Sequence, residues 1–141
     1  MAALVDTNIL VYRFDGRDPR KQRIATEVLR GGIADRSVVI AHQAVVEFYA
    51  AVTRSFRGAG SLLDRAAATR EAEELLVVFD VLYPTEELVR AALRATAAYE
   101  LPWFDALMWA YADTNGINEI FSEDFQGGRI YGRVKVTNPF L

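Results

Sequence analysis

The sequence predicts an α/β fold in which a central parallel sheet of four to five strands lies between helices on both faces. Short apolar runs that end in turn-forming polar residues are typical of strands buried on both faces, as in parallel sheets. These runs alternate with longer segments of helical character, and such alternation favours a three-layer sandwich of helix, sheet and helix. With 141 residues, 52% of them hydrophobic, the chain is expected to form a single domain over residues 1–141 with a sizeable core.

The composition excludes several classes of protein and site. The formal net charge of −3 argues against nucleic-acid binding through bulk positive charge, although it leaves room for local basic patches. Because the chain has no cysteine, disulfides, thiolate metal sites and cysteine nucleophiles are excluded. No apolar run approaches the roughly 20 residues that a helix needs to cross a bilayer. We therefore expect a soluble, cytoplasmic protein with no membrane partner.

The first strand is expected at the start of the chain, where an apolar run leads into three polar residues. Residues 1–5 are apolar and are followed by Asp6, Thr7 and Asn8. Asp6 is therefore expected at the carboxyl end of a buried strand, where open α/β sheets place their active sites. Thr7 and Asn8 are expected to cap a helix over residues 9–14. A purely structural role for Asp6, as a cap at this strand-to-helix turn, stays open.

The other elements are predicted from apolar periodicity and from the turn residues at their ends. We expect helices over residues 20–29 (closed by Gly31-Gly32), 43–56, 61–76 (capped by Ser61), 84–99 and 103–115. Strands are expected at 38–40, within 77–83 and at 118–122, and an edge strand is expected at 133–137, where polarity alternates. The Arg-Gly-Ala-Gly segment at 57–60 ends a helix and is no phosphate loop, because a Gly-Lys-Ser/Thr sequence is missing.

Glu47 is the second candidate acid, placed inside the apolar stretch of the helix expected over 43–56. Its neighbours on the same helix face are mostly small, which leaves room for an ion or another backbone near the carboxylate. Arg54 lies two turns further on, so a surface ion pair between Glu47 and Arg54 is the structural alternative. The small-neighbour face consists of Gln43, Ala44, Ala50 and Ala51.

Two further acids stand at element ends. Asp105 lies in the first turn of the helix expected over 103–115, where an aspartate is often only a cap or a partner of the helix dipole. It also faces an apolar stripe, where an unpaired carboxylate is costly and favours a charge partner or a metal. Asp124 follows the strand at 118–122, directly after Glu123. The topology can bring Asp105 and Asp124 to the same edge of the sheet as Asp6.

Three or four carboxylates within a few ångströms repel one another strongly unless a cation or a proton intervenes. Oxygen ligands with no cysteine and a single histidine, His42, suit Mg²⁺ or Mn²⁺ rather than zinc. A hard divalent ion held in this way activates water and neutralises charge on a phosphodiester. The acids therefore predict a metal-dependent reaction at a phosphate ester.

At this point the residues match a known family. The chain resembles a PIN-domain ribonuclease of the VapC-like toxin group over nearly its whole length. Each motif is weak alone, but four acids in order and in matching surroundings are specific together. The matching elements are Asp6-Thr7-Asn8, Glu47 in Val45-Val46-Glu47-Phe48, Asp105 in Phe104-Asp105-Ala106-Leu107, Ser122-Glu123-Asp124-Phe125-Gln126, and the closing residues Asn138-Pro139-Phe140.

The resemblance implies a metal-dependent endoribonuclease, usually the toxin of a two-gene toxin–antitoxin pair. It further implies a PIN-like three-layer sandwich, a homodimer, and an antitoxin whose carboxyl-terminal segment covers the acidic site. Because Glu123 adjoins the fourth acid, the choice of Asp124 rests on the motif rather than on chemistry. The metal-binding and catalytic set carried over from the family is Asp6, Glu47, Asp105 and Asp124, with Asn8 and Ser122 as the hydrogen-bonding residues behind it.

An acidic pocket repels RNA, so basic residues near it are the natural phosphate contacts. Arginine supplies 14 of the 16 basic residues, and its planar fork suits phosphate, although a GC-rich genome gives the same bias. A run of charge at a helix start is also typical of a solvated face. The arginines expected to bind RNA are Arg13, Arg17, Arg20 and Arg54.

Other classes fit less well. A phosphohydrolase with an aspartate nucleophile needs a second acid two residues after the first, and that position is Asn8. A Ser-His-Asp hydrolase has only His42 to use and lacks a Gly-x-Ser-x-Gly turn. A receiver domain needs a lysine beside its acids, and neither Lys21 nor Lys135 follows a buried strand end. A non-catalytic α/β binding module remains the alternative outside enzymes.

Overall fold

The computed structural model describes residues 2–56, 60–125 and 128–141. Its helices are α1 (Thr7–Tyr12), α2 (Pro19–Asp35), α3 (His42–Thr53), α4 (Arg65–Val78), α5 (Glu86–Tyr99) and α6 (Trp103–Thr114). Its strands are β1 (Ala3–Val5), β2 (Val38–Ala41), β3 (Asp80–Leu82), β4 (Glu119–Phe121), β5 (Ile130–Tyr131) and β6 (Val134–Thr137). None of the helices in the described part of the chain is long and apolar enough to cross a membrane.

The strands form one sheet in the order β3-β2-β1-β4-β6-β5. Every neighbouring pair is parallel except β5 and β6, which are antiparallel. β1 lies at the centre, with Leu4 paired to Val39 on one side and to Ile120 on the other. The predicted fold class, a parallel sheet with helices on both faces, is confirmed, but the sheet has six strands in the described part of the chain instead of four to five, and β5 runs antiparallel to β6.

The prediction of an edge strand at 133–137 is wrong. β6 pairs with both β4 and β5, so the short strand β5 forms the edge. Val134 and Val136 are buried and Lys135 between them is exposed, so the alternation shows that β6 has one buried and one exposed face. Exposure of a face does not indicate whether both backbone edges of the strand are paired, so alternating polarity cannot identify an edge strand.

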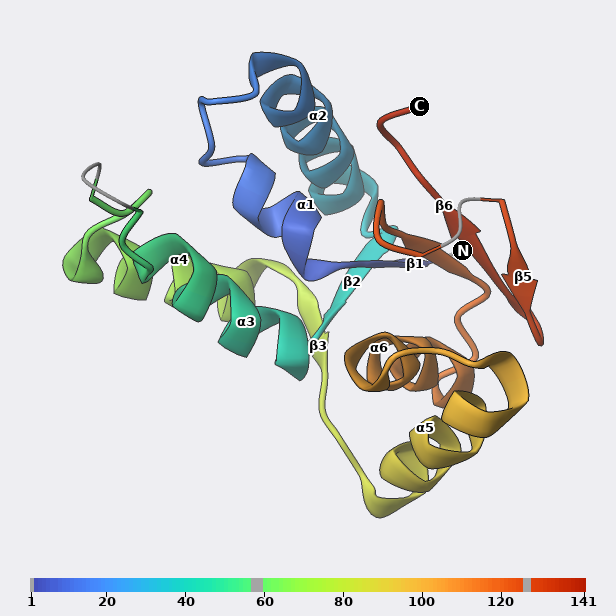
Figure 1. Cartoon of the computed structure of the whole chain (residues 1–141). Helices are drawn as coiled ribbons and strands as arrows, with labels where there is room; N and C mark the ends of the chain where they lie inside the picture. Colours follow the sequence, from blue (N-terminus) through green and yellow to red (C-terminus); the bar gives the residue numbers. More distant parts are fainter. Residues whose placement is uncertain (1, 57–59, 126–127) are drawn as a thin grey trace.

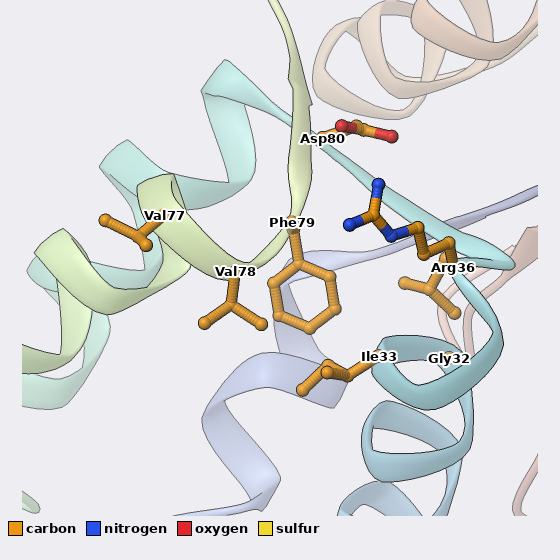
Figure 2. Close-up of a pocket in the computed structure, with 8 residues that line it drawn as sticks. Gly32, Ile33, Arg36, Val77, Val78, Phe79 and Asp80 are labelled. Atoms are coloured by element: carbon orange, nitrogen blue, oxygen red, sulfur yellow. The ribbon is translucent and has the colours of Figure 1, made fainter.

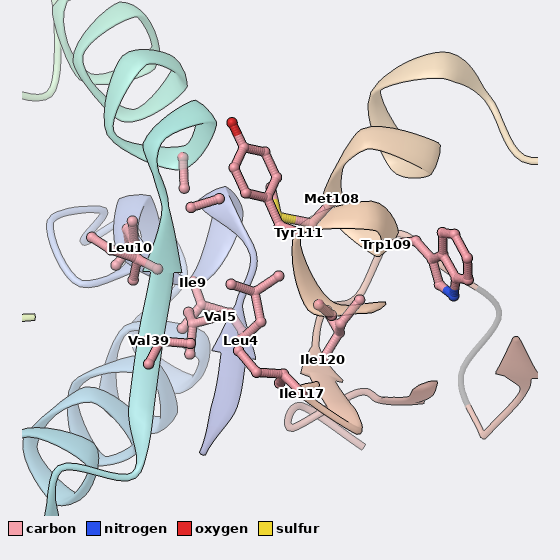
Figure 3. Packing of buried hydrophobic residues seen from close by; sticks show 14 of the residues in the cluster. Leu4, Val5, Ile9, Leu10, Val39, Met108, Trp109, Tyr111, Ile117 and Ile120 are labelled. Atoms are coloured by element: carbon pink, nitrogen blue, oxygen red, sulfur yellow. The ribbon is translucent and has the colours of Figure 1, made fainter. Parts of the chain in front are cut away.

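The core lies on both faces of β1. Figure 1 shows α1 and α2 on one side of the sheet and α5 and α6 on the other, with α3 and α4 projecting beside it as a pair. Leu4 and Val5 are fully buried, and Figure 3 shows them between Ile9 of α1 and Met108 of α6. A strand with no exposed residue is held rigidly, which fixes the position of whatever follows it.

Helix α2 continues through Gly31 and Gly32, where the sequence predicted its end. Gly32 lies against β2 so closely that an added Cβ would sit 2.2 Å from Cγ2 of Val38. The glycine therefore permits close packing instead of stopping the helix. The helix ends at Asp35, and Arg36, which adopts the left-handed conformation with φ 56°, caps it.

The α3–α4 region begins and ends differently from the prediction. α3 ends at Thr53 instead of residue 56, and residues 57–59, where that end was expected, lie outside the described residues. α4 begins after Asp64, whose carboxylate accepts a hydrogen bond from the Ala67 amide at 2.7 Å, so Ser61 is not its cap. Val77 and Val78 belong to the end of α4, so β3 is shorter than the predicted strand and begins at Asp80.

Candidate functional site

Asp6 follows β1 and is buried, with 7% of its surface exposed. Its Oδ1 accepts a hydrogen bond from the Thr7 amide at 2.7 Å, and its Oδ2 accepts one from the Ser122 hydroxyl at 2.6 Å. Asp6 itself therefore caps α1. The prediction that Thr7 and Asn8 cap this helix is wrong, because both residues lie inside it. Burial raises the pKa of Asp6 to about 6, with the charges of Asp124 and Glu47 adding to the rise.

Glu47 projects from α3 towards the same end of the sheet. Its Oε1 accepts a hydrogen bond from the Thr7 hydroxyl at 3.0 Å and another from the Gln43 side-chain amide at 3.1 Å. This hydrogen bond thus joins Glu47 to Thr7, the residue directly after Asp6. The alternative of an ion pair with Arg54 is not seen among the described residues, although both side chains line one cavity.

Asp105 lies in the first turn of α6, as predicted. The cap position of that helix is Pro102, which makes no side-chain cap bond, and no hydrogen bond to the Asp105 carboxylate occurs in the described part of the chain. Burial raises the pKa of Asp105, and the charges of Asp124 and Glu47 raise it further. A carboxylate that is partly buried and electrostatically opposed is more typical of a functional group than of a cap.

Asp124 and Glu123 follow β4 side by side but have different surroundings. Glu123 accepts a hydrogen bond from the Tyr12 hydroxyl and forms an ion pair with Lys21, whose Nζ lies 2.7 Å from Oε2. Asp124 lines two cavities instead. Its pKa is raised by burial and then by the charge of Glu123, with Glu47 contributing. These contacts support the choice of Asp124, over Glu123, as the acid of the site.

The residues expected behind the acids lie among them. The Ser122 hydroxyl donates to Asp6 and accepts a hydrogen bond from the Asp124 amide at 3.1 Å. The Asn8 side chain lies beside the Asp124 carboxylate and opposes the rise in its pKa. Its geometry falls short of a full hydrogen bond, so both polar atoms of the Asn8 amide are buried without a partner among the described residues. Buried polar atoms of this kind are costly and are typical of a site that takes a ligand.

Two cavities meet at Asp124. The larger, about 410 Å³, is bounded by α1 and α3, and the smaller, about 350 Å³, by α5, α6 and the segments after β4. The larger contains Glu47 and the smaller contains Asp105, so a chain lying across both would pass over the acids. The larger is lined by Thr7, Asn8, Val11, Tyr12, Glu47, Ala50, Ala51, Arg54 and Asp124. The smaller is lined by Tyr99, Glu100, Leu101, Pro102, Asp105, Asp124, Phe125, Arg129 and Tyr131.

Of the four arginines expected to bind phosphate, Arg54 lines the larger cavity. Arg13 approaches Glu71 of α4 at 3.9 Å, and Arg17 forms a two-bond ion pair with Asp15. The Arg20 guanidinium donates to the backbone carbonyl of the penultimate residue. The structure thus brings Arg54 to the acids and engages the other three in protein contacts.

The four acids fit a hard divalent cation by their chemistry. All are oxygen donors, and burial together with mutual repulsion raises the pKa of Asp6, Asp105 and Asp124. The acids oppose one another in pairs, and no three histidine, aspartate or glutamate side chains of the described residues are close enough to hold one ion as they stand. The site therefore has the donor set for a cation, arranged more openly than a closed metal centre.

Sequence reasoning overlooked the two hydrogen-bond donors of Glu47. Gln43 is one turn before Glu47, so the four-residue spacing on one helix face was the available signal. Thr7 was read only as a cap, and its contact with Glu47 spans 40 residues, which no local pattern reports.

A third cavity, about 340 Å³, lies at the amino ends of β2 and β3, away from the acids. Figure 2 shows Ile33, Val78 and Phe79 facing one another there, with Arg36 and Asp80 at the border. It contains one carboxylate and one guanidinium, and it lacks the acid cluster found at the carboxyl ends of the strands.

Comparisons with known proteins identify the family of the fold. Residues 3–132 match the family model of the PIN domain. No curated protein gives a match. Among solved structures, a toxin–antitoxin complex from Klebsiella pneumoniae is 19% identical with a TM-score of 0.68 and 98% of each chain covered. The toxin VapC20 of Mycobacterium tuberculosis, described as cleaving the Sarcin-Ricin loop, is 21% identical with a TM-score of 0.65, covering 92% of this chain and 97% of that one.

VapBC2 of Rickettsia felis, solved with a DNA fragment from its promoter, is 13% identical with a TM-score of 0.70, and 98% of each chain is covered. At such identities these likenesses show the shared fold. The family model, in contrast, is matched by the sequence itself, over most of the chain. The chain therefore belongs to the PIN domain family.

Proposed function

We propose that this protein is a metal-dependent endoribonuclease and the toxin component of a toxin–antitoxin pair. One observation carries the proposal: within a PIN domain, four acids from distant parts of the chain face one another electrostatically at the carboxyl edge of the sheet. Such an arrangement is unfavourable for the protein alone and is relieved by a cation.

The residues that would hold Mg²⁺ or Mn²⁺ are Asp6, Glu47, Asp105 and Asp124. When bound, such an ion neutralises charge on a phosphodiester and lowers the pKa of a bound water. Ser122 fixes the carboxylate of Asp6 and the backbone of Asp124, and thereby holds two of the acids in register.

Asn8 and Arg54 are the groups proposed to face the RNA. The buried Asn8 amide has polar atoms available for a ligand, and it lies next to Asp124. Arg54 lines the cavity that holds Glu47, where its guanidinium is suited to a phosphate beside the scissile one. Arg17 and Arg20 would need to leave their present partners to bind RNA. Arg13 lies 3.9 Å from Glu71, and two of its guanidinium nitrogens are buried without a hydrogen-bond partner among the described residues.

A protein partner is proposed on separate grounds. The solved structures with this fold include complexes described as toxin–antitoxin assemblies. Val46 and Phe104 are 56% and 63% exposed on the elements that carry Glu47 and Asp105. Apolar side chains beside the acids would suit a second copy of the chain or an antitoxin segment that covers the site. A cytoplasmic homodimer with an antitoxin is therefore part of the proposal, and light scattering tests the dimer.

The function is tested by RNA cleavage after chelation. Protein treated with EDTA is expected to be inactive, and Mg²⁺ or Mn²⁺ is expected to restore cutting of RNA that contains the target site. A panel of structured RNAs is needed, because a specific target would leave generic RNA nearly intact. Cleavage that persists in EDTA would overturn the metal-dependent reaction.

Two alternatives are separated by the same experiment. A non-catalytic binding module is favoured by the absence of a closed three-ligand metal centre in the described part of the chain; it predicts metal or RNA binding without cleavage. An aspartate-nucleophile phosphohydrolase predicts a phosphorylated Asp6. That chemistry needs a second acid two residues after the nucleophile, and Asn8 occupies this position, which argues against Asp6 as a nucleophile.

A further inference from the structure

We propose that Glu123 acts with Tyr12 and Lys21 as a positioning latch that holds Asp124 in place for metal binding. The proposal rests on the proposed function and assigns a role to the acid that the family motif leaves unused. Glu123 is a positioning residue here, acting through its neighbour Asp124, and the three residues together are called the Glu123 latch.

The latch consists of contacts between three segments. The Tyr12 hydroxyl, at the end of α1, donates a hydrogen bond to Oε1 of Glu123. Nζ of Lys21, in the first turns of α2, lies 2.7 Å from Oε2 of the same carboxylate and 3.4 Å from the Tyr12 hydroxyl. Both oxygens of Glu123 are therefore engaged. The loop after β4 is thus fastened to α1 and α2.

Aromatic packing supports the latch from the C-terminal end of the chain. The rings of Tyr12 and Phe140 meet edge to face, with centroids 5.2 Å apart. Nζ of Lys21 lies 5.0 Å and 5.5 Å from the centroids of these two rings. Cation–π contacts of this length favour one position of the ammonium group, which restricts where the Glu123 carboxylate is held.

The constraint reaches Asp124 through the peptide that joins the two residues. Consecutive Cα atoms are held about 3.8 Å apart across a trans peptide, so fastening Glu123 limits how far the backbone of Asp124 can move, although φ and ψ between the two residues stay free. Ser122, on the other side of Glu123, binds both the Asp124 amide and the Asp6 carboxylate. Without the latch, Ser122 would remain the only side-chain anchor of this turn among the contacts described above.

Helix α1 connects the latch to a second acid. Asp6 caps the first turn of α1, and Tyr12 is its last residue. One rigid helix therefore fixes Asp6 at one end and, through Glu123, the turn that carries Asp124 at the other. This is the physical reason to expect that the latch sets the geometry between Asp6 and Asp124.

The latch makes a different prediction from simple charge effects. Replacing Lys21 by methionine removes a positive charge near an acidic site, so electrostatics alone predicts tighter binding of a cation. The latch predicts weaker binding, because the Asp124 carboxylate loses its fixed position. Tyr12→Phe keeps the ring and changes no charge, so electrostatics predicts no effect while the latch again predicts weaker binding.

The test is a Mn²⁺ titration followed by the electron paramagnetic resonance signal of free Mn²⁺. We expect Kd to rise about tenfold in Tyr12→Phe and in Lys21→Met, within the range typical of residues that orient metal ligands. Lys21→Arg keeps the ion pair and is expected to bind nearly as the parent does. Glu86→Gln breaks an exposed ion pair with Arg90 on α5 and serves as a matched control with unchanged Kd.

A second measurement needs no metal. The Asp124 amide donates to Ser122, so its hydrogen exchange reports the order of the turn. Faster exchange at Asp124 in Tyr12→Phe and Lys21→Met, with the same global stability as Lys21→Arg, supports the latch even if the parent fails to bind Mn²⁺ and the proposed function fails. Parent-like exchange in both variants overturns the latch, as does parent-like or tighter Mn²⁺ binding by Lys21→Met.

Discussion

The two ends of the parallel strands each open into a cavity, and the chemistry of these cavities differs. At the amino ends, about 340 Å³ is lined mainly by apolar residues such as Ile33, Val78 and Phe79. At the carboxyl ends, about 410 Å³ and 350 Å³ meet at Asp124, among acids whose pKa values are raised. Cavity volume does not distinguish the two ends.

The two ends differ in that the carboxyl ends hold buried polar groups whose charges or hydrogen bonds are not compensated within the described part of the chain. At the carboxyl ends, Asp6 is buried and opposed by Asp124 and Glu47, and the Asn8 amide lacks partners among the described residues. These costs persist in a fold only where function maintains them or packing leaves no alternative. The comparison thus supports the proposal of a functional site at the carboxyl edge and of a packing role for the amino edge.

The largest expected effect is loss of cleavage in Asp105→Asn. Since residues that merely orient metal ligands are worth 10–100-fold, removing a proposed ligand is expected to lower cleavage by about 100-fold or more. The metal-free variant should be no less stable than the parent, because a repelling charge has been removed. Melting curves with and without Mg²⁺ should show a larger metal-induced shift in the parent.

Asp80→Asn is the matched control for this variant, since Asp80 borders the amino-edge cavity. It is expected to cleave RNA as the parent does. An active Asp105→Asn protein with the parent's full Mg²⁺ shift would remove Asp105 from the site and weaken the comparison between the two edges.

The pH dependence of stability gives the next largest effect. The pKa of Asp6 is about 6 in the folded chain, compared with 3.8 for an unperturbed aspartate. A group that holds its proton more tightly when folded favours the fold at low pH, so this contribution is lost as pH rises from about 4 to about 6. By linkage the loss amounts to about 3 kcal/mol.

Urea unfolding in EDTA across this pH range measures the effect. The parent is expected to lose stability relative to Asp6→Asn as pH rises, and Mg²⁺ at pH 7 should restore part of the loss. If the two proteins have parallel pH profiles, then the burial of Asp6 carries no such cost.

Gly32→Ala probes the amino edge, where packing is expected to dominate. The added Cβ would meet Cγ2 of Val38 at 2.2 Å, and overpacking of this kind typically costs about 1–3 kcal/mol. Gly31→Ala is the matched control, because a Cβ there meets nothing within 4 Å. It is expected to stabilise α2 by about 0.5–1 kcal/mol.

Free energies of unfolding from urea titration measure both glycine variants. RNA cleavage per folded molecule should be unchanged in both. A large loss of cleavage in folded Gly32→Ala would show that the amino edge also serves function.

The smallest expected effect concerns Arg54. Arg54→Gln is expected to weaken RNA binding and to reduce the slope of log K against log salt by about one, the share of one phosphate contact. Arg36→Gln, at the amino-edge cavity, is the matched control and should keep the parent slope. Binding isotherms at several salt concentrations measure this slope. Equal slopes for all three proteins would show that Arg54 makes no phosphate contact.

The sequence predicted those features that depend on local chemistry. Apolar runs followed by polar turns gave the strands that precede Asp6 and Asp124, and the first-turn position of Asp105 follows from a helix start after Pro102. Two of the errors have one cause in common: Gly31-Gly32 and the alternation at 133–137 were interpreted from local propensity, whereas contacts with another element decided the outcome. The error at Ser61 is local, because Asp64, three residues later, caps α4 instead.

By itself the sequence determined the fold class, because this follows from periodicity and residue type, and the resemblance to the PIN family supplied the four proposed acids. Tertiary structure alone decided what each acid faces. Glu123 and Asp124 are adjacent and chemically alike, yet the first pairs with Lys21 and the second lines both cavities. The physical reason is that these surroundings come from residues about 100 positions away, and neither charge nor helical period encodes a contact at that separation.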